Sequence, residues 1–269
     1  MKADRDAQRA HRGVAEFNRQ PADVLLIGSQ VVYGAVGITG ALPIYHDAGM
    51  RVLALPTVIL SSMPHYANSH RSVQPAQWIG QTMDDLLELG LIDEISTVVT
   101  GYFASPEQIE VVADRLRGIR TTHPHLRFVV DPTVGDSDVG VYTAPGIAEA
   151  LAAHLIPQAT GLTPNVFEFD HFTGEGDPVT RARGLLGPRG RWVVVTSASH
   201  DEDTVSNLIV TRTAVHEVSA PHIDSGAKGT GDVFTAALVA GLHRGMELVD
   251  AAAAAAAAVS GGLGVDKHG

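Results

Sequence analysis

The chain has 269 residues, a formal net charge of −11 at pH 7 and no cysteine. The lack of cysteine excludes disulfides, thiolate nucleophiles and cysteine-based zinc sites. The negative charge argues against nucleic acid and anionic membrane surfaces as partners. A hydrophobic content of 45% suffices for a large core, and the length favours one large α/β domain over two small ones.

Residues 1–20 are polar and charged, and they lack the apolar stretch that a signal peptide needs. We therefore predict a partly disordered segment over residues 1–20 and a single domain over residues 21–269. No run of residues is long and apolar enough to span a membrane, so the expected compartment is the cytoplasm.

Strand and helix patterns alternate along the chain. Continuous apolar runs predict buried parallel strands at 24–27, 52–55, 97–100, 128–130 and 192–195. Helical patterns lie between them at 75–89, from Ser105 as N-cap followed by Pro106, and at 145–155. Residues 207–211 and 214–218 predict an antiparallel pair, and two helices follow, the second with the alanine run 251–258. The alternation predicts a sheet with helices on both faces.

Polar residues follow the predicted strands, at the carboxyl ends where such sheets bind ligands. They are Ser29 and Gln30, Thr57, Gly101 and Tyr102, Asp131 and Pro132, and Thr196 and Ser197. Strand ends are polar in many folds, so this arrangement indicates a cleft without defining its chemistry.

The most informative motif is Gly229-Thr230-Gly231-Asp232, which opens an apolar helical pattern. Glycines at a helix N-terminus let backbone N–H groups approach an anion, and the helix dipole adds partial positive charge. A carboxylate there repels phosphate, but it suits a base that accepts the proton of an attacking hydroxyl. The chain contains no Gly-x-x-x-x-Gly-Lys-Ser/Thr loop. These residues alone indicate either a small-molecule kinase site or a helix start in which Asp232 only complements the dipole.

Further short motifs accompany this one, in a fixed order. They are Ser29-Gln30-Val31-Val32-Tyr33-Gly34, Pro56-Thr57-Val58, Pro64-His65-Tyr66, Thr100-Gly101-Tyr102, Asp131-Pro132, Thr163-Pro164-Asn165 with Glu168, and Thr196-Ser197-Ala198-Ser199. Over about residues 20–265 the chain resembles the pyridoxal kinase family of the ribokinase-like superfamily. The resemblance implies a three-layer α/β/α sandwich with a mostly parallel central sheet. It also implies ATP-dependent phosphorylation of the 5′-hydroxyl of pyridoxal, pyridoxine and pyridoxamine in vitamin B6 salvage.

The resemblance also implies roles at the phosphoryl-transfer site. Asp232 would be the general base, and Gly229 and Gly231 would form the anion hole. The residues implied at ATP are Asp131, Thr163, Glu168, Thr196, Ser197, Gly229, Thr230, Gly231 and Asp232. Mg²⁺ is the implied cofactor, with Asp131 and Glu168 on its side of the nucleotide. Glu168 as an ordinary surface glutamate is the alternative.

The implied substrate pocket consists of Ser29, Thr57, His65, Tyr102 and Asp232. Pyridoxal is a flat pyridine, so Ser29 would meet its polar edge and Tyr102 its face. Tyr142 ends a lid-like loop and would offer its backbone carbonyl to a monovalent cation such as K⁺, unless it only covers that loop. The resemblance further implies a homodimer. Where relatives often carry Gly-Asn-Ser, this chain has Gly37-Ile38-Thr39.

Three other functions are less consistent with these residues. A hydroxymethylpyrimidine kinase of the same superfamily also takes a flat heteroaromatic alcohol, but His65 and the motif at Ser29 argue against it. A non-catalytic pyridoxal-binding protein has no need of a base at Asp232. A nicotinamide dehydrogenase would carry Gly-x-Gly-x-x-Gly after the first strand, and that motif is missing.

Overall fold

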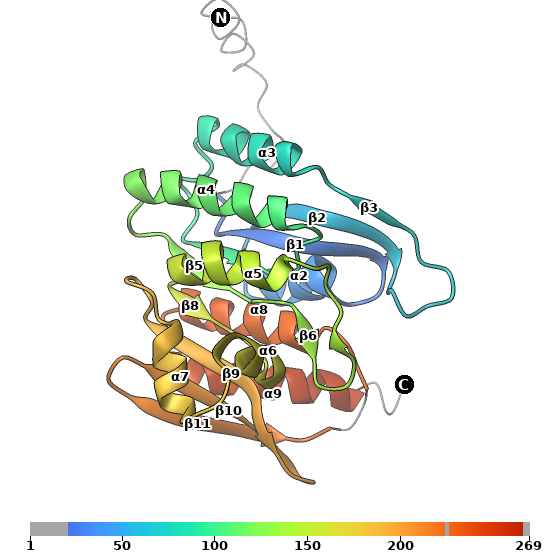
Figure 1. The fold of residues 1–269 in the computed structure, drawn as a ribbon, viewed down its shortest axis with the longest axis vertical. Helices are drawn as coiled ribbons and strands as arrows, with labels where there is room; N and C mark the ends of the chain where they lie inside the picture. The colour runs from blue at the N-terminus through green and yellow to red at the C-terminus, as the bar shows by residue number, and fades with distance from the viewer. Residues whose placement is uncertain (1–20, 224–225, 266–269) are drawn as a thin grey trace, which may run out of the picture.

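The computed structural model describes residues 21–223 and 226–265, and the prediction for residues 1–20 lies outside them. Within the described residues a nine-stranded sheet has the order β11-β10-β9-β8-β5-β4-β1-β2-β3 (Figure 1). Its parallel strands are β1 (Val24–Tyr33), β2 (Val52–Ser62), β4 (Thr97–Thr100), β5 (Arg127–Val130), β8 (Gly161–Leu162) and β9 (Trp192–His200). The antiparallel strands at its edges are β3 (Arg71–Val73), β10 (Thr204–Thr211) and β11 (Val215–Pro221). The predicted mostly parallel sheet is confirmed.

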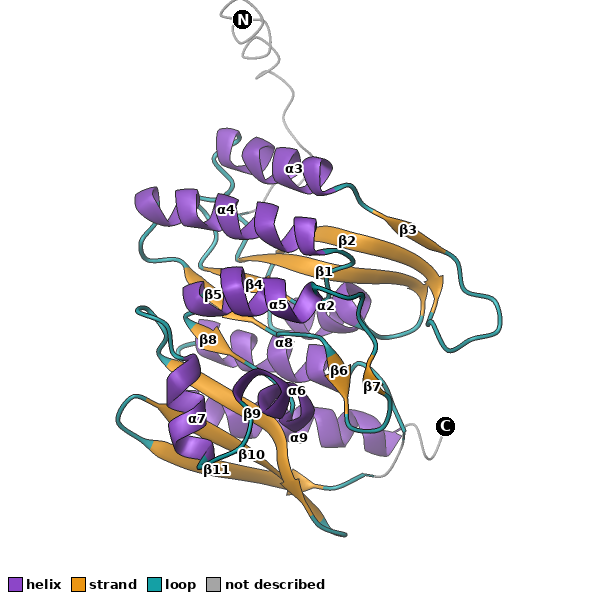
Figure 2. Cartoon of the chain, in the orientation of Figure 1, coloured by secondary structure: helices purple, strands orange, loops and turns teal. Residues whose placement is uncertain are grey.

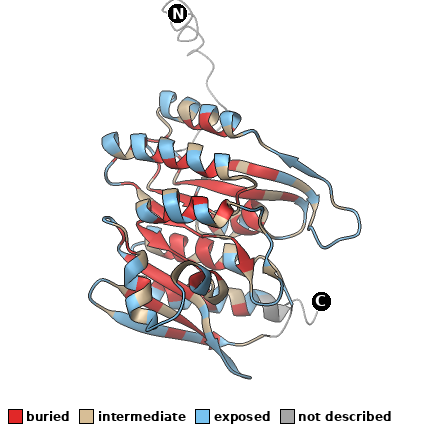
Figure 3. Ribbon diagram, in the orientation of Figure 1, coloured by how far each residue is buried: buried red, intermediate tan, exposed pale blue. Residues whose placement is uncertain are grey.

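Helices cover both faces of this sheet (Figure 2). One face carries α3 (Ala76–Glu88), α4 (Pro106–Thr122), α5 (Ile147–Ala150), α6 (Val166–Thr173) and α7 (Pro178–Leu185). The other carries α2 (Gly37–Asp47), α8 (Thr230–His243) and α9 (Leu248–Val265). The central strands are buried from both sides, which explains their continuous apolar sequence (Figure 3). The predicted three-layer α/β/α sandwich is therefore confirmed.

The predicted helices are present with small differences at their ends. Ser105 is the N-cap residue of α4, and Pro106 is the first residue of the helix, as predicted. The Ser105 side chain makes no capping hydrogen bond and instead hydrogen-bonds to the Glu107 carboxylate. The helix predicted at 145–155 is α5 followed by a π-helical turn over Leu151–Leu155. The alanine run lies in α9, which packs against α8. No helix of the described residues is both long and apolar enough to cross a bilayer.

The first two strands extend further than predicted. Ser29 and Thr57 were expected after strand ends, but they lie inside β1 and β2. The register between these strands shifts between Gly28 and Ser29. Beyond the shift, the Thr39 hydroxyl accepts from Val31 N at 3.1 Å and donates to Val31 O at 2.8 Å. These bonds and the pairing with β2 explain why the strand continues where the apolar run ends.

The strand order reverses at β1, which lies between β2 and β4. The helix after β1, α2, lies on one face, and the helix before β4, α3, lies on the other. In open α/β sheets ligands bind outside the carboxyl ends of the strands at such a point. From the topology we therefore expect a binding site near Ser29 of β1 and near Gly101 and Tyr102, which follow β4.

Candidate active site

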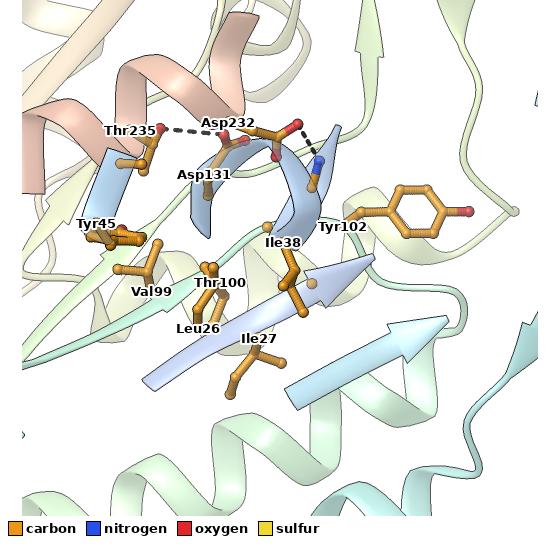
Figure 4. A pocket seen from close by; sticks show the side chains of 15 residues that line it. Leu26, Ile27, Ile38, Tyr45, Val99, Thr100, Tyr102, Asp131, Asp232 and Thr235 are labelled. Atoms are coloured by element: carbon orange, nitrogen blue, oxygen red, sulfur yellow. Dashed lines mark hydrogen bonds between the residues drawn. The ribbon is translucent and has the colours of Figure 1, made fainter. Parts of the chain in front are cut away.

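A cavity of about 20 Å³ lies at the point where the strand order reverses (Figure 4). Its polar side chains come from β4, from the residues that follow β4 and β5, and from the helices α2 and α8 on one face of the sheet. They are Tyr45, Thr100, Tyr102, Asp131, Asp232 and Thr235. The fold thus brings three predicted site residues, Tyr102, Asp131 and Asp232, to one place.

The turn that begins α8 holds Asp232. Gly229 is the N-cap residue with φ +88°, and a Cβ there would lie 2.3 Å from the Ala35 carbonyl oxygen. Asp232 follows in the first helical turn, and its Oδ2 accepts a hydrogen bond from Gly37 N at 2.7 Å. Gly37 begins α2 with φ +57°, and a Cβ there would lie 2.2 Å from Ser29 O. The N-termini of α8 and α2 therefore meet at this carboxylate.

Burial changes how readily Asp232 ionises. Desolvation raises the pKa of its carboxyl from 3.8 to about 6, against the opposing effect of the Gly37 N–H bond. A carboxyl with this pKa is ionised at neutral pH and is a stronger base than an exposed aspartate. The geometry and the pKa together suit a side chain that accepts a proton.

Asp131 is buried beside Asp232. Burial and then the charge of Asp232 raise the pKa of Asp131, although two hydroxyls stabilise its ionised form. Thr133 Oγ1 donates to Asp131 Oδ1 at 2.8 Å, and Thr235 Oγ1 lies 3.4 Å from Oδ2. A Cβ on Gly231 would lie 3.8 Å from Asp131 Oδ2, so this carboxylate faces the glycine turn.

Glu168 is buried, and the alternative of a surface glutamate is wrong. Its Oε1 accepts from Val134 N at 2.9 Å and its Oε2 from Asn165 N at 3.0 Å. In return Asn165 Oδ1 accepts from Glu168 N at 2.9 Å, which completes a capping box at α6. Burial, followed by the charge of Asp131, raises the pKa of Glu168. The carboxylate thus ties α6 to the segment after β5.

Two predicted ligand-binding threonines point into the protein. Thr57 has no exposed surface, and its hydroxyl donates to Tyr102 O at 2.7 Å. The side chain thus supports Tyr102 from behind, and a direct substrate contact from Thr57 stays a prediction. Thr163 is also buried, and its hydroxyl pairs with that of Thr235 at 2.9 Å. Through Thr235 it reaches the Asp131 carboxylate.

The other predicted site residues lie around this centre. Ser29 is buried next to Gly37. Thr196 and Ser197 lie in β9, and Thr196 N donates to Pro164 O at 2.9 Å. His65 is exposed in the loop between β2 and β3, where its ring contacts Tyr66, and the structure does not bring it to the cavity.

A short hairpin of β6 (Gly135–Asp136) and β7 (Gly140–Val141) forms the predicted lid-like loop. Tyr142 follows it, and burial and then the charge of Glu168 raise the pKa of its phenol. Lys228, just before the glycine turn, places its Nζ 2.6 Å from Asp138 Oδ2 and 3.6 Å from Asp136 Oδ2. The hairpin is thus joined to the turn by ion pairs, and Lys228 is not a free surface lysine.

Sequence reasoning missed Gly37, Thr133 and Thr235. Gly37 donates its backbone N–H to Asp232, and Thr133 and Thr235 direct their hydroxyls to Asp131. No local sequence pattern marks a residue for such a contact. Among residues 21–223 and 226–265, no group of three or more His, Cys, Asp or Glu side chains has the arrangement of a metal site.

Comparisons with known proteins agree with this geometry. A family model described as phosphomethylpyrimidine kinase matches residues 34–266. A pyridoxine/pyridoxal/pyridoxamine kinase of Bordetella bronchiseptica is 41% identical over 244 residues, which cover 88% of this chain and 86% of that protein. The crystal structure of pyridoxal kinase from Entamoeba histolytica has a TM-score of 0.85 at 23% identity and covers 91% of this chain and 90% of its own.

A further structure, pyridoxal kinase from Leishmania donovani in complex with ADP and pyridoxine, has a TM-score of 0.78 at 26% identity and covers 86% of this chain and 81% of its own. The fold, the family model and the curated relative together define a kinase of the ribokinase-like superfamily. At 41% identity to a curated relative over most of both sequences, the chain belongs to the pyridoxal kinase family within the phosphomethylpyrimidine kinases.

Proposed function

We propose that this protein transfers the γ-phosphoryl group of ATP to the 5′-hydroxyl of pyridoxal, pyridoxine and pyridoxamine. The observation that carries the proposal is the Asp232 carboxylate, held by Gly37 N–H in the first turn of α8 at the edge of a cavity. The relatives at 40–41% identity are named for all three vitamers, which supports this range of substrates.

In this reaction Asp232 accepts the proton of the 5′-hydroxyl. The freed oxygen forms a bond to the γ-phosphorus, and the bond from that phosphorus to the β–γ bridging oxygen breaks, which releases ADP. Backbone N–H groups of Gly229, Thr230 and Gly231 stabilise the negative charge of the group in transfer. A base with a pKa near 6 is mostly unprotonated at neutral pH, so it is ready to take the proton.

The acidic cluster fits a divalent cation such as Mg²⁺. Asp131 and Glu168 supply the oxygen donors that Mg²⁺ prefers. Burial raises the pKa of both carboxyls, with a further rise from the charge of Asp232 at Asp131 and from the charge of Asp131 at Glu168. When bound, the cation would neutralise charge on the phosphates. We also propose that the Tyr142 carbonyl contributes to a site for a monovalent cation such as K⁺.

The nucleotide and the vitamer would occupy different parts of the cleft. Thr196 and Ser197 of β9 would contact ATP, with Thr163 held behind them through Thr235. Ser29 and Tyr102, at the reversal of strand order, would hold the pyridine ring at its edge and face. His65 reaches this pocket only if the loop between β2 and β3 folds inward, so its role stays a prediction.

We further propose a cytoplasmic homodimer. The strands β1, β2 and β3 continue beyond the helices that cover the sheet (Figure 2). This extension carries exposed apolar side chains. Val32 is 78% exposed, Tyr33 69% and Val73 44%. Exposed apolar groups gathered on one projecting element favour burial against a second copy of the chain.

One assay tests the proposed reaction. The purified protein, ATP and Mg²⁺ are incubated with each vitamer and with hydroxymethylpyrimidine, and the phosphorylated products are identified by mass spectrometry. We expect 5′-phosphates of the vitamers, formed at least about a hundredfold more slowly by an Asp232→Ala variant. Hydroxymethylpyrimidine is included because the family model is described as phosphomethylpyrimidine kinase. Product from that alcohol alone would replace our proposal with a pyrimidine kinase, and no product from any alcohol would refute both.

A further inference from the structure

The pairing of β9 with β10 is interrupted at the predicted nucleotide site. Leu208 pairs with Val195, and Ser206 pairs with Ser199. Between these two pairs β10 has one residue, Asn207, whereas β9 has three, 196–198. The extra residues, 196–198, face Asn207 alone, so β9 carries a bulge.

The centre of this bulge has an unusual backbone conformation. Ser197 has a φ of +51°, and within residues 21–223 and 226–265 it is the one non-glycine residue with a positive φ. The left-handed region is unfavourable for a residue with a Cβ and easily accessible to glycine. Such strain persists where neighbouring groups hold it, and it occurs most often at ligand sites.

Asn207 is the neighbour that holds Ser197. Its Oδ1 accepts a hydrogen bond from Ser197 N at 3.2 Å, and its Nδ2 lies 3.5 Å from Val218 O in β11. The side chain is buried, with 4% of its surface exposed. On the opposite side of the bulge, Thr196 N donates to Pro164 O. The bulge is thus fixed on both sides, while the Ser197 side chain is exposed.

We propose that Asn207 is a positioning residue for the nucleotide: its amide oxygen holds Ser197 in the left-handed conformation and so directs Thr196 and Ser197 toward the phosphates. This inference rests on the proposed function, which puts ATP at those two residues. Asn207 contacts no substrate itself. Its effect should therefore appear in nucleotide affinity and not in pyridoxal affinity, because the vitamer pocket lies at β1 and β4.

Equilibrium titrations of the full-length protein test this role, with ADP plus Mg²⁺ in one series and pyridoxal in another. We expect Asn207→Ala to weaken ADP binding about tenfold, equivalent to about 1.4 kcal/mol, and to leave pyridoxal binding unchanged. The matched control is Ser206→Ala, which removes a buried hydroxyl of the same strand that pairs with Ser219 at 2.8 Å. Both affinities should stay within about twofold in the control.

Rescue by glycine separates this role from general stability. In a Ser197→Gly background the positive φ needs no support, so adding Asn207→Ala should weaken ADP binding less than about threefold. Ser197→Ala, which keeps the Cβ, should give no rescue. If Asn207→Ala alone does not fold, the Ser197→Gly double variant should recover the native circular dichroism spectrum.

Several outcomes would overturn the inference. They are equal losses of ADP and pyridoxal affinity in Asn207→Ala, unimpaired ADP binding in that variant, and a double variant that binds no better than Asn207→Ala or does not fold. A wild-type protein that binds pyridoxal but not ADP would instead refute the proposed nucleotide site, and this inference with it.

Discussion

Replacing Asp232 by asparagine should abolish most activity and yet stabilise the ligand-free protein at neutral pH. Burial raises the pKa of Asp232 from 3.8 to about 6. Between these two values the folded state binds more protons than the unfolded state, so stability falls as the pH rises through this window. The difference of about 2 pKa units corresponds to about 2–3 kcal/mol above the window. Asparagine keeps the shape and an oxygen acceptor for Gly37 N–H, but it carries no charge.

Urea unfolding, followed through the fluorescence of the buried Trp192, measures this difference. We expect the Asp232→Asn variant to gain less than about 1 kcal/mol near pH 4 and about 2–3 kcal/mol near pH 7, while turnover falls by roughly 10²–10⁴-fold. The control is Asp250→Asn, which removes an exposed carboxylate from the first turn of α9. A gain that does not vary with pH, or a variant less stable than wild type near pH 7, would refute the reasoning.

Three further substitutions test other parts of the site. Gly37→Ala should lower turnover at least tenfold, because a Cβ would stand 2.2 Å from Ser29 O. The control is Gly49→Ala, which has a φ of +75° but no atom near its Cβ position and therefore tests backbone strain alone. Tyr45→Phe should leave the thermal midpoint of unfolding unchanged or raise it by a few degrees, because the buried Tyr45 hydroxyl has no hydrogen-bond partner among the described residues. A lower thermal midpoint would contradict this and show that the hydroxyl makes a stabilising hydrogen bond. Asp131→Asn should raise the Mg²⁺ concentration for half-maximal rate without weakening pyridoxal binding, and an unchanged metal dependence would make Asp131 structural.

The parts of the fold predicted from the sequence are those in which local pattern and tertiary burial agree. The five apolar runs lie in strands, and four of them are buried on both faces, whereas Ala54 in the run 52–55 is exposed. The helical face of Ile109, Val112, Ala113 and Leu116 is buried as its spacing indicates. Asp232 was found because glycines at a helix N-terminus leave a direct mark in the sequence.

Other features depend on contacts that the local sequence does not record. Gly37 and Asp232 are 195 residues apart, so their hydrogen bond follows from the placement of α2 beside α8. The continuation of β1 beyond Gly28 depends on the Thr39 side chain and on pairing with β2. The hydrogen bond from the Thr57 hydroxyl to the Tyr102 carbonyl likewise joins residues that no local pattern connects.

Electrostatics decides how this site binds a highly charged nucleotide. The chain carries a net charge of −11, and the ionised Asp232 carboxylate adds local negative potential, while burial raises the pKa of Asp131 and of Glu168 and disfavours their charged forms. The charge of Lys228 is shared with Asp136 and Asp138 of the hairpin. In the proposed reaction, attraction of the phosphates would therefore fall to the backbone N–H groups of the glycine turn and to a bound cation. Since a vitamer carries no such charge, ATP affinity should depend on the divalent cation far more strongly than pyridoxal affinity does.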